Sequence, residues 1–159
     1  MPPLCRHTLI EYYDCDPTRL LRAREVKASL LAAVRAGHGT IVKSVFHNFS
    51  PYGVSGVVVI TESHVTVHTW PEHNYAAVDI FSCSRKLNHA IIRRHLKKAF
   101  AAGDVSVKSF HRGRIREPDA IPPLKRHKRQ LEGPSLPIES VGHSERASSA
   151  SAISSGACG

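Results

Sequence analysis

The segment from residue 53 to residue 83 constrains the fold of this chain more than any other part. It contains two apolar, strand-like runs, 56–60 and 76–81, and between residues 64 and 70 polar or aromatic side chains alternate with Val and Thr. A period of two is typical of a half-buried strand, and a continuous apolar run is typical of a strand that is covered on both faces. Because the connections are short, we predict neighbouring antiparallel strands.

Most of the reactive side chains of the chain lie in this segment. His64 and His68 have a spacing that can bind zinc on a helix, but a strand would place them roughly 13 Å apart. Ligands of one zinc ion lie about 2 Å from the metal, so we predict no metal site. Ser63 does not lie in a G-x-S-x-G sequence, which argues against an esterase-like nucleophile. A sheet strand that only happens to carry two histidines remains an alternative on spacing alone.

The rest of the chain supplies the other elements of one small domain. We expect further strands over residues 6–13, 40–49 and 105–111, and helices over residues 17–36 and 85–102. The predicted fold class is α/β, in the form of an α+β two-layer sandwich with helices on one face of a mostly antiparallel sheet. Since the run 56–60 is apolar on both sides, the other face would be turned towards a dimer partner.

The composition bears on partners and on the compartment. The 159 residues include 22 Lys and Arg against 13 Asp and Glu, a net charge of +9, which raises nucleic-acid binding as an alternative. The basic residues are scattered and no RNA-binding pattern of aromatic residues is present, so we do not expect it. Cys5, Cys15, Cys83 and Cys158 lack C-x-x-C spacing, which predicts free thiols in a reducing compartment. Without a signal-like or membrane-spanning apolar run, we expect a cytoplasmic protein.

The composition changes after about residue 115. Prolines recur, a basic cluster occupies residues 125–129, and the last residues are of low complexity. We therefore predict one domain over residues 1–115, followed by a mostly disordered tail over residues 116–159. A solvated basic run is the simpler interpretation of the cluster, and contact with RNA is the alternative.

The central segment carries a resemblance to a known family. The sequence ESHVTVHTWPE, preceded by FSPYGVSGVVVI and followed by YAAVDIFSC, closely resembles the bacterial and archaeal S-adenosylmethionine decarboxylases, the pyruvoyl enzymes of polyamine synthesis. The resemblance spans roughly residues 7–113. It implies a proenzyme that cleaves itself between Glu62 and Ser63, giving a small subunit of residues 1–62 and a large subunit from residue 63.

The same resemblance implies how the cofactor forms. The Ser63 hydroxyl would attack the preceding carbonyl and turn the amide into an ester. Elimination of that ester would leave dehydroalanine, which becomes a covalent pyruvoyl group at the new N-terminus. That group would form a Schiff base with the substrate amine and accept electrons as carbon dioxide leaves. His68 matches the proton acceptor of processing, Ser55 a hydroxyl that assists processing, and Cys83 the proton donor of catalysis. On a straight strand Ser63 and His68 would lie about 16 Å apart, so the chain must bend there or the pair is not adjacent.

The resemblance also implies a substrate site and an assembly. Phe49 and Trp70 match aromatic groups that stack on adenine, and Glu72 matches a carboxylate that holds the ribose hydroxyls. The family resemblance implies a homodimer with sites at or near the interface. The chain departs from the family pattern after Cys83, where residues 84–88 replace a loop containing Gly and Asp.

These observations lead to one main hypothesis and three alternatives. The main hypothesis is decarboxylation of S-adenosylmethionine to the aminopropyl donor for spermidine synthesis. The first alternative keeps the chemistry and acts on arginine or ornithine. The second is a non-catalytic, basic nucleic-acid-binding relative, although such a module needs none of Ser63, His68 and Cys83. A serine hydrolase is the third.

Overall fold

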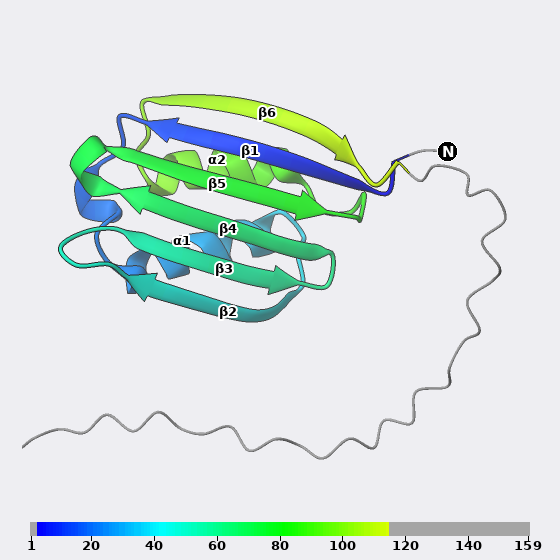
Figure 1. Ribbon diagram of the computed structural model, residues 1–159, viewed down its shortest axis with the longest axis horizontal. Helices are drawn as coiled ribbons and strands as arrows, with labels where there is room; N and C mark the ends of the chain where they lie inside the picture. Colours follow the sequence, from blue (N-terminus) through cyan, green and yellow to red (C-terminus); the bar gives the residue numbers. More distant parts are fainter. Residues whose placement is uncertain (1–2, 115–159) are drawn as a thin grey trace, which may run out of the picture. The chain divides into compact units, whose positions relative to one another are not determined.

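The computed structural model describes residues 3–114, which form one six-stranded sheet with two helices behind it in the view of Figure 1. The elements are β1 (Cys5–Tyr13), η1 (Pro17–Arg19), α1 (Ala23–Ala36), β2 (Ile41–Asn48), β3 (Val54–Ile60), β4 (Ser63–Trp70), η2 (Pro71–His73), β5 (Tyr75–Ser82), α2 (His89–Ala99) and β6 (Asp104–Arg112). The strand order is β2-β3-β4-β5-β1-β6, and every neighbouring pair is antiparallel. The predicted fold class and element order are confirmed.

The hydrophobic core lies between the two helices and one face of the sheet. In β4 the alternate residues Val65, Val67 and Thr69 are buried, as the period of two predicts. On α1 the buried apolar residues include Val26, Leu30 and Val34, and on α2 they are Ile92 and Leu96.

The predicted helix over residues 17–36 is in fact two elements. Asp16 accepts a hydrogen bond from the Thr18 backbone N–H at 3.0 Å, which closes the short turn η1 instead of starting a long helix. The true start of α1 has no cap from its own segment. Asn48, at the end of β2, accepts the Ala23 N–H at 2.7 Å and thereby caps α1 from another element.

The second helix begins later than predicted. Ser84 accepts a hydrogen bond from the Lys86 N–H at 3.1 Å, forming a local turn that competes with helix formation. The Asn88 side chain then caps α2, so the helix starts at residue 89 and not at residue 85. At the other end the chain leaves the helix through Ala101, whose φ of 50° is left-handed.

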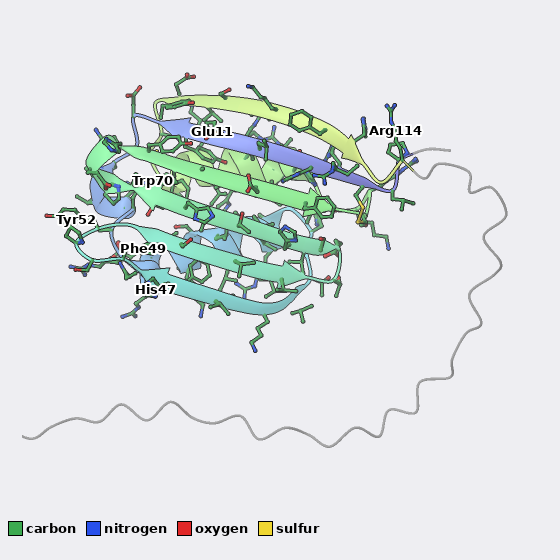
Figure 2. All side chains as sticks on the ribbon, viewed as in Figure 1. Glu11, His47, Phe49, Tyr52, Trp70 and Arg114 are labelled. Atoms are coloured by element: carbon green, nitrogen blue, oxygen red, sulfur yellow. A yellow bond between two sulfur atoms is a disulfide. The ribbon has the colours of Figure 1, made fainter. Side chains whose placement is uncertain are left out.

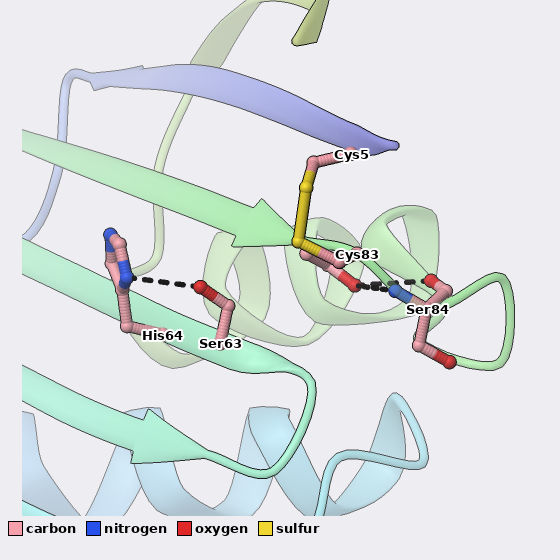
Figure 3. Close-up of a disulfide and its surroundings, with 6 residues drawn as sticks. Cys5, Ser63, His64, Cys83 and Ser84 are labelled. Atoms are coloured by element: carbon pink, nitrogen blue, oxygen red, sulfur yellow. Dashed lines mark hydrogen bonds between the residues drawn. A yellow bond between two sulfur atoms is a disulfide. The ribbon is translucent and has the colours of Figure 1, made fainter. Parts of the chain in front are cut away.

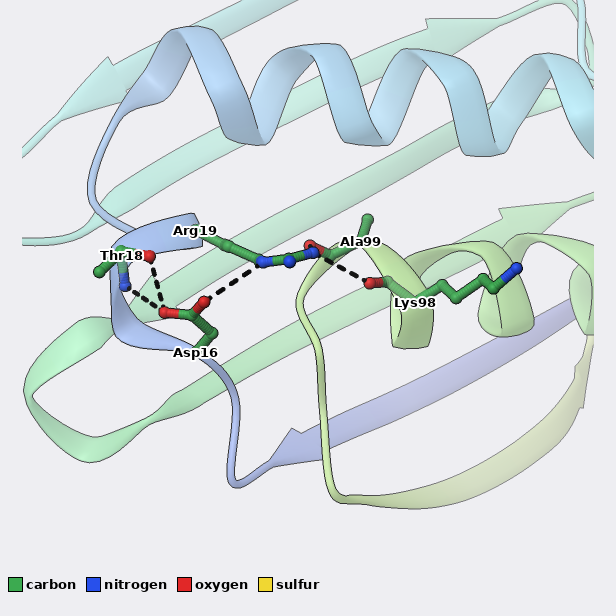
Figure 4. Close-up of polar contacts among 5 residues, drawn as sticks. All are labelled: Asp16, Thr18, Arg19, Lys98 and Ala99. Atoms are coloured by element: carbon green, nitrogen blue, oxygen red, sulfur yellow. Dashed lines mark hydrogen bonds and ion pairs between the residues drawn. The ribbon is translucent and has the colours of Figure 1, made fainter.

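Arg19 joins the turn η1 to the end of α2, as Figure 4 shows. Its Nε lies 3.3 Å from an Asp16 carboxylate oxygen, and its guanidinium donates to the carbonyls of Lys98 and Ala99 at 3.3 and 3.1 Å. Those carbonyls belong to the last turn of α2, where a cation is favoured by the helix dipole. The contact holds the connection after β1 against the helix layer.

The second face of the sheet is uncovered in a single chain. Within one chain the run 56–60 is covered on one face only, because Val58 is fully buried while Val59 is 41% exposed. The dimer partner expected to cover the other face stays a prediction. Val45 on β2, in register with Val57, is 57% exposed, and Trp70 on β4 is 40% exposed. We call this side of the sheet the open face. Exposed apolar side chains gathered on one face are typical of an interaction surface.

Two further sequence predictions concern the C-terminal tail and a membrane-spanning segment. The predicted tail over residues 116–159 lies outside the described residues. Within residues 3–114, neither helix has the length and apolar composition needed to cross a membrane.

Candidate active site

The turn between β3 and β4 presents Ser63 with an unusual backbone conformation. Its φ is 146°, a backbone angle that residues other than glycine rarely adopt. Its hydroxyl lies 3.3 Å from Nδ1 of His64, as Figure 3 shows. The carbonyl oxygen of Glu62, the residue before it, accepts a hydrogen bond from the Cys83 backbone N–H at 3.1 Å. The bond between residues 62 and 63 is therefore held against the end of β5.

The Glu62 carboxylate points to a different partner. One of its oxygens accepts the Thr40 backbone N–H at 3.2 Å, at the start of β2. Burial alone would raise the pKa of Glu62, but hydrogen bonds from the backbone of Glu62 and Thr40 outweigh it and lower the pKa below its usual value. The carboxylate thus remains an anion that fixes the turn in place.

Cys83 is joined to Cys5 by a disulfide in this structure (Figure 3). The prediction that these two are free thiols is therefore wrong, while Cys15 is free and buried, and Cys158 lies outside the described residues. The pairing arises because β1 and β5 are neighbours with Arg6 opposite Ser82, which puts the next residues of each strand side by side. A search for short C-x-x-C spacing cannot detect a pair separated by 78 residues.

Ser55 and His68 form a second polar pair, on β3 and β4. They face each other in the register of the two strands, and Ser55 Oγ lies 2.6 Å from His68 Nδ1. The His68 ring is exposed on the open face, with its centroid 6.2 Å from that of Trp70. The hydroxyl orients the imidazole and leaves its other nitrogen available.

The predicted substrate-binding residues lie together beside this pair. A cavity of about 300 Å³ is lined by Phe49, Tyr52, Val54, His68, Thr69, Trp70 and Glu72. Figure 2 shows Phe49, Tyr52 and Trp70 at the same end of the sheet. Phe49 is 52% exposed and Trp70 is 40% exposed, so both rings are accessible to a ligand. Two aromatic faces and a carboxylate suit a flat, cationic ligand that carries hydroxyl groups.

The structure thus brings the predicted site residues together in two separate groups. The turn group consists of Glu62, Ser63 and Cys83, and the groove group consists of Phe49, Ser55, His68, Trp70 and Glu72. Ser63 and His68 belong to the same continuous strand, β4, and are five residues apart. At about 3.3 Å per residue their separation is about 16 Å, so a single chain does not bring them into contact.

Comparison with known proteins identifies the family. The sequence model of the S-adenosylmethionine decarboxylase family matches residues 6–113. This chain belongs to that family. An S-adenosylmethionine decarboxylase proenzyme from Thermotoga petrophila is 46% identical over 117 residues, which cover 74% of this chain and 90% of that protein. Another from Acidithiobacillus ferrooxidans is 43% identical over 115 residues, covering 72% of this chain and 86% of that protein.

The fold supports the same assignment. The crystal structure of the adenosylmethionine decarboxylase from Aquifex aeolicus matches with a TM-score of 0.68 and 26% sequence identity, covering 76% of this chain and all of that one. The resemblance inferred from the segment around Ser63 is therefore confirmed. Within residues 3–114, no group of three or more His, Cys, Asp or Glu side chains is arranged to hold a metal ion.

Sequence reasoning missed two residues of this site, His64 and Tyr52, and one neighbour of the turn group, Cys5. His64 adjoins Ser63 in the sequence, so its contact with the hydroxyl could have been anticipated from position alone. Tyr52 lines the groove because a turn at Gly53, with a φ of 102°, carries the chain back from β2 to β3. Cys5 had no local signal, since only the pairing of distant strands places it beside Cys83.

Proposed function

We propose that this chain is a cytoplasmic, self-processing, pyruvoyl-dependent S-adenosylmethionine decarboxylase that supplies the aminopropyl donor for spermidine synthesis. The observation that carries the proposal is the geometry between residues 62 and 63. A serine with a strained backbone follows a carbonyl that is already hydrogen-bonded by a backbone N–H. Such a donor stabilises the negative charge that develops on a carbonyl oxygen under nucleophilic attack.

The processing step follows from these contacts. The Ser63 hydroxyl attacks the Glu62 carbonyl carbon, His64 Nδ1 at 3.3 Å accepts the hydroxyl proton, and the Cys83 N–H stabilises the oxyanion. The amide nitrogen leaves as the free amine of residue 63, which converts the amide into an ester. Loss of the Ser63 α-proton to a base then expels Glu62 as a carboxylate and leaves dehydroalanine at position 63. Its imine tautomer takes up water and releases ammonia, which leaves the pyruvoyl carbonyl. We assign that base to His68, whose imidazole is oriented by Ser55.

The residues present fit a pyruvoyl group at position 63. Residue 63 is the first of a strand and is partly exposed, so a new chain end can form there without breaking β4. The group supplies an electrophilic carbonyl that binds the substrate amine and takes up the electron pair left when carbon dioxide departs. Cys83, in its reduced form, lies beside the turn and returns a proton to the substrate α-carbon.

The groove group would bind the nucleoside part of the substrate. Phe49 and Trp70 offer exposed ring faces for adenine and for the sulfonium cation, and Glu72 is positioned to accept hydrogen bonds from the ribose hydroxyls. An amino acid such as arginine or ornithine has no ring to stack between these aromatic groups. The shape of the groove therefore favours S-adenosylmethionine.

A complete site needs a second copy of the chain. The turn group and the groove group are about 16 Å apart along β4, and the open face that carries the groove group also exposes Val45 and Val59. We propose a homodimer in which two open faces pack about a two-fold axis. The turn group of one copy then meets the groove group of the other, and the apolar side chains become buried.

The first test combines mass and activity. Reduced, denatured protein should give two fragments that break between residues 62 and 63, the larger one with a pyruvoyl end, and S-adenosylmethionine should release carbon dioxide. Ser63→Ala should remain one chain without activity. A panel containing arginine and ornithine tests the substrate. A chain that stays whole, or a processed chain that acts only on another amino acid, would contradict the proposal.

The second test addresses the shared site. Ser63→Ala and His68→Ala should each be inactive as a homodimer. When the two are co-expressed, half of the dimers are mixed and each mixed dimer contains one complete site, so about a quarter of the wild-type activity should return. Co-expression of Ser63→Ala with Cys83→Ala is the matched control, because both changes fall in the turn group and no complete site forms. Equal activity in the two mixtures would exclude a shared site.

A further inference from the structure

The cysteine pair at the end of β5 lies in an environment that the decarboxylation chemistry does not explain. Cys83 is exposed and Cys5 is half-buried, and they are bonded across the neighbouring strands β5 and β1, with their Cα atoms 4.0 Å apart. The strands hold both residues by regular pairing up to Arg6 and Ser82. The two sulfur atoms are thus positioned for each other by the sheet itself.

A basic cavity opens beside the disulfide. It has a volume of about 360 Å³ and is lined by Pro3, Leu4, Cys5, Arg6, Ser82, Cys83, Ser84, Arg85 and His111. This volume lies within the range of small-molecule sites, roughly 300–1,000 Å³. The lining contains two guanidinium groups and an imidazole but no carboxylate. Among residues 3–114, neither Arg6 nor Arg85 forms an ion pair.

This charge pattern selects one class of reactant. Arg6 and Arg85 both line the cavity, and Arg85 is the second residue after Cys83. Unpaired guanidinium groups attract carboxylates and orient them through paired hydrogen bonds. A small anionic disulfide, such as the oxidised form of a carboxylate-bearing thiol, has both the charge for the cavity and a sulfur–sulfur bond for the adjacent cysteine.

We propose that Cys5 and Cys83 form a redox modification site at which a small anionic disulfide switches the decarboxylase off. The Cys83 thiolate attacks one sulfur of the reagent, and the other leaves as a thiolate. The Cys5 thiolate then attacks the mixed disulfide at Cys83 and releases the second small thiolate. The two electrons of the cysteine pair reduce the reagent to two thiolates, which take up the two cysteine protons through solvent, and the Cys5–Cys83 bond remains.

The consequence for activity rests on the proposed function. Once bonded to Cys5, the Cys83 sulfur carries no proton to return to the substrate, so decarboxylation should stop while substrate binding in the groove group remains. Processing adds a second consequence, because Cys5 lies in the fragment 1–62 and Cys83 in the fragment from 63. Oxidation should therefore link the two fragments covalently, and a reducing agent should separate them again and restore activity.

The experiment uses the full chain with Cys158→Ser, so that the cysteines of the described residues are the only ones left. Processed protein is treated with oxidised glutathione or with dithiothreitol, its thiols are blocked, and it is run on a non-reducing gel. We expect one linked species without activity after oxidation and two fragments with full activity after reduction. Two unlinked fragments after oxidation would overturn the proposal.

Variants separate the steps. Cys5→Ser should be active when reduced, and on oxidation should accumulate the mixed disulfide on Cys83 without linking the fragments. Cys15→Ser, which changes the buried cysteine, should behave like the parent. Arg85→Glu should slow linkage by oxidised glutathione roughly tenfold at low ionic strength and leave the rate with neutral 2-hydroxyethyl disulfide unchanged. Equal slowing with both reagents would refute the anionic reactant.

The redox proposal and the proposed function can fail independently. If the reduced protein remains one chain, processing has failed, and peptide mapping of the oxidised chain still decides whether Cys5 and Cys83 pair. If the reduced protein processes and decarboxylates but oxidation neither links the fragments nor lowers activity, the redox site alone is refuted.

Discussion

Replacing His89 by asparagine should make the stability of this protein less sensitive to acid. His89, the first residue of α2, is 5% exposed, and its Nδ1 lies 2.8 Å from the hydroxyl of Thr8, which is 4% exposed. Thr8 is in turn 2.9 Å from the Ser109 hydroxyl. Burial, together with the nearby charges of Arg6 and His7, lowers the pKa of His89 from 6.5 to about 4.

The sign and size of the effect follow from this shift. Between pH 6.5 and 4 the unfolded chain binds a proton at His89 that the folded chain does not. The free energy of unfolding is therefore highest above pH 6.5, the pKa in the unfolded chain, and falls as the pH approaches about 4, the pKa in the folded chain. Relative to pH 8, linkage through pKa values of 6.5 and about 4 gives a loss of about 2 kcal/mol at pH 5 and about 3 kcal/mol at pH 4.

Urea unfolding at pH 8, 6 and 5, at one protein concentration, measures this loss. Asparagine at position 89 keeps a hydrogen-bonding group but does not titrate. At pH 8 we expect His89→Asn to be less stable than the parent by about 1–2 kcal/mol, and by pH 5 the difference should vanish or reverse. His73→Asn, at an exposed histidine, controls for the chemical change itself. If the gap between parent and His89→Asn were the same at every pH, the buried histidine would not be the cause.

Three further predictions concern the frame and the groove. Asn48→Ala should lower the free energy of unfolding by about 1–2 kcal/mol, because the Ala23 N–H at the start of α1 loses its cap, as urea denaturation would show. Gly56→Ala should cost about 1–3 kcal/mol, since a Cβ there would meet the Phe46 ring, and thermal unfolding of a double variant with Phe46→Leu should recover part of the loss. Trp70→Ala should raise KM for S-adenosylmethionine about tenfold and change kcat little, since an adenine-stacking ring acts mainly in binding. Steady-state kinetics measures both constants, and a fall in kcat with an unchanged KM would contradict this role.

The strands were predictable from the sequence because their signal is local. Alternation in β4 and the apolar run in β3 are properties of neighbouring residues, and each strand lies within two residues of its predicted bounds. The helix starts were less predictable, because their caps are not local. Asn48 reaches the start of α1 from β2, across 25 residues, and nothing within the helical segment announces it.

In the candidate site, too, contacts set by a local turn were predictable from the sequence and contacts between distant strands were not. A tight turn between Ile60 and Ser63 fixes the register of β3 and β4, and each step along one strand is matched by a step along the other, so Ser55 must face His68. That pair could have been derived from the sequence once the turn was recognised. The pairing of Cys5 with Cys83 could not, because no turn joins β1 to β5 and their register depends on the whole sheet.

The same register argument explains why the second copy matters. Ser63 and His68 lie on one extended strand, and every residue of that strand from Ser63 to Trp70 is paired with β5. Bringing the two side chains together within one chain would require β4 to fold back and to give up this pairing. No rotation of the two side chains closes a gap of about 16 Å. The proposed two-fold packing of open faces would remove this conflict without altering any strand, because it would supply His68 from another chain. Activity restored by mixing Ser63→Ala with His68→Ala would therefore follow from the sheet geometry, whereas a site formed within one chain would require β4 to differ from the strand described here.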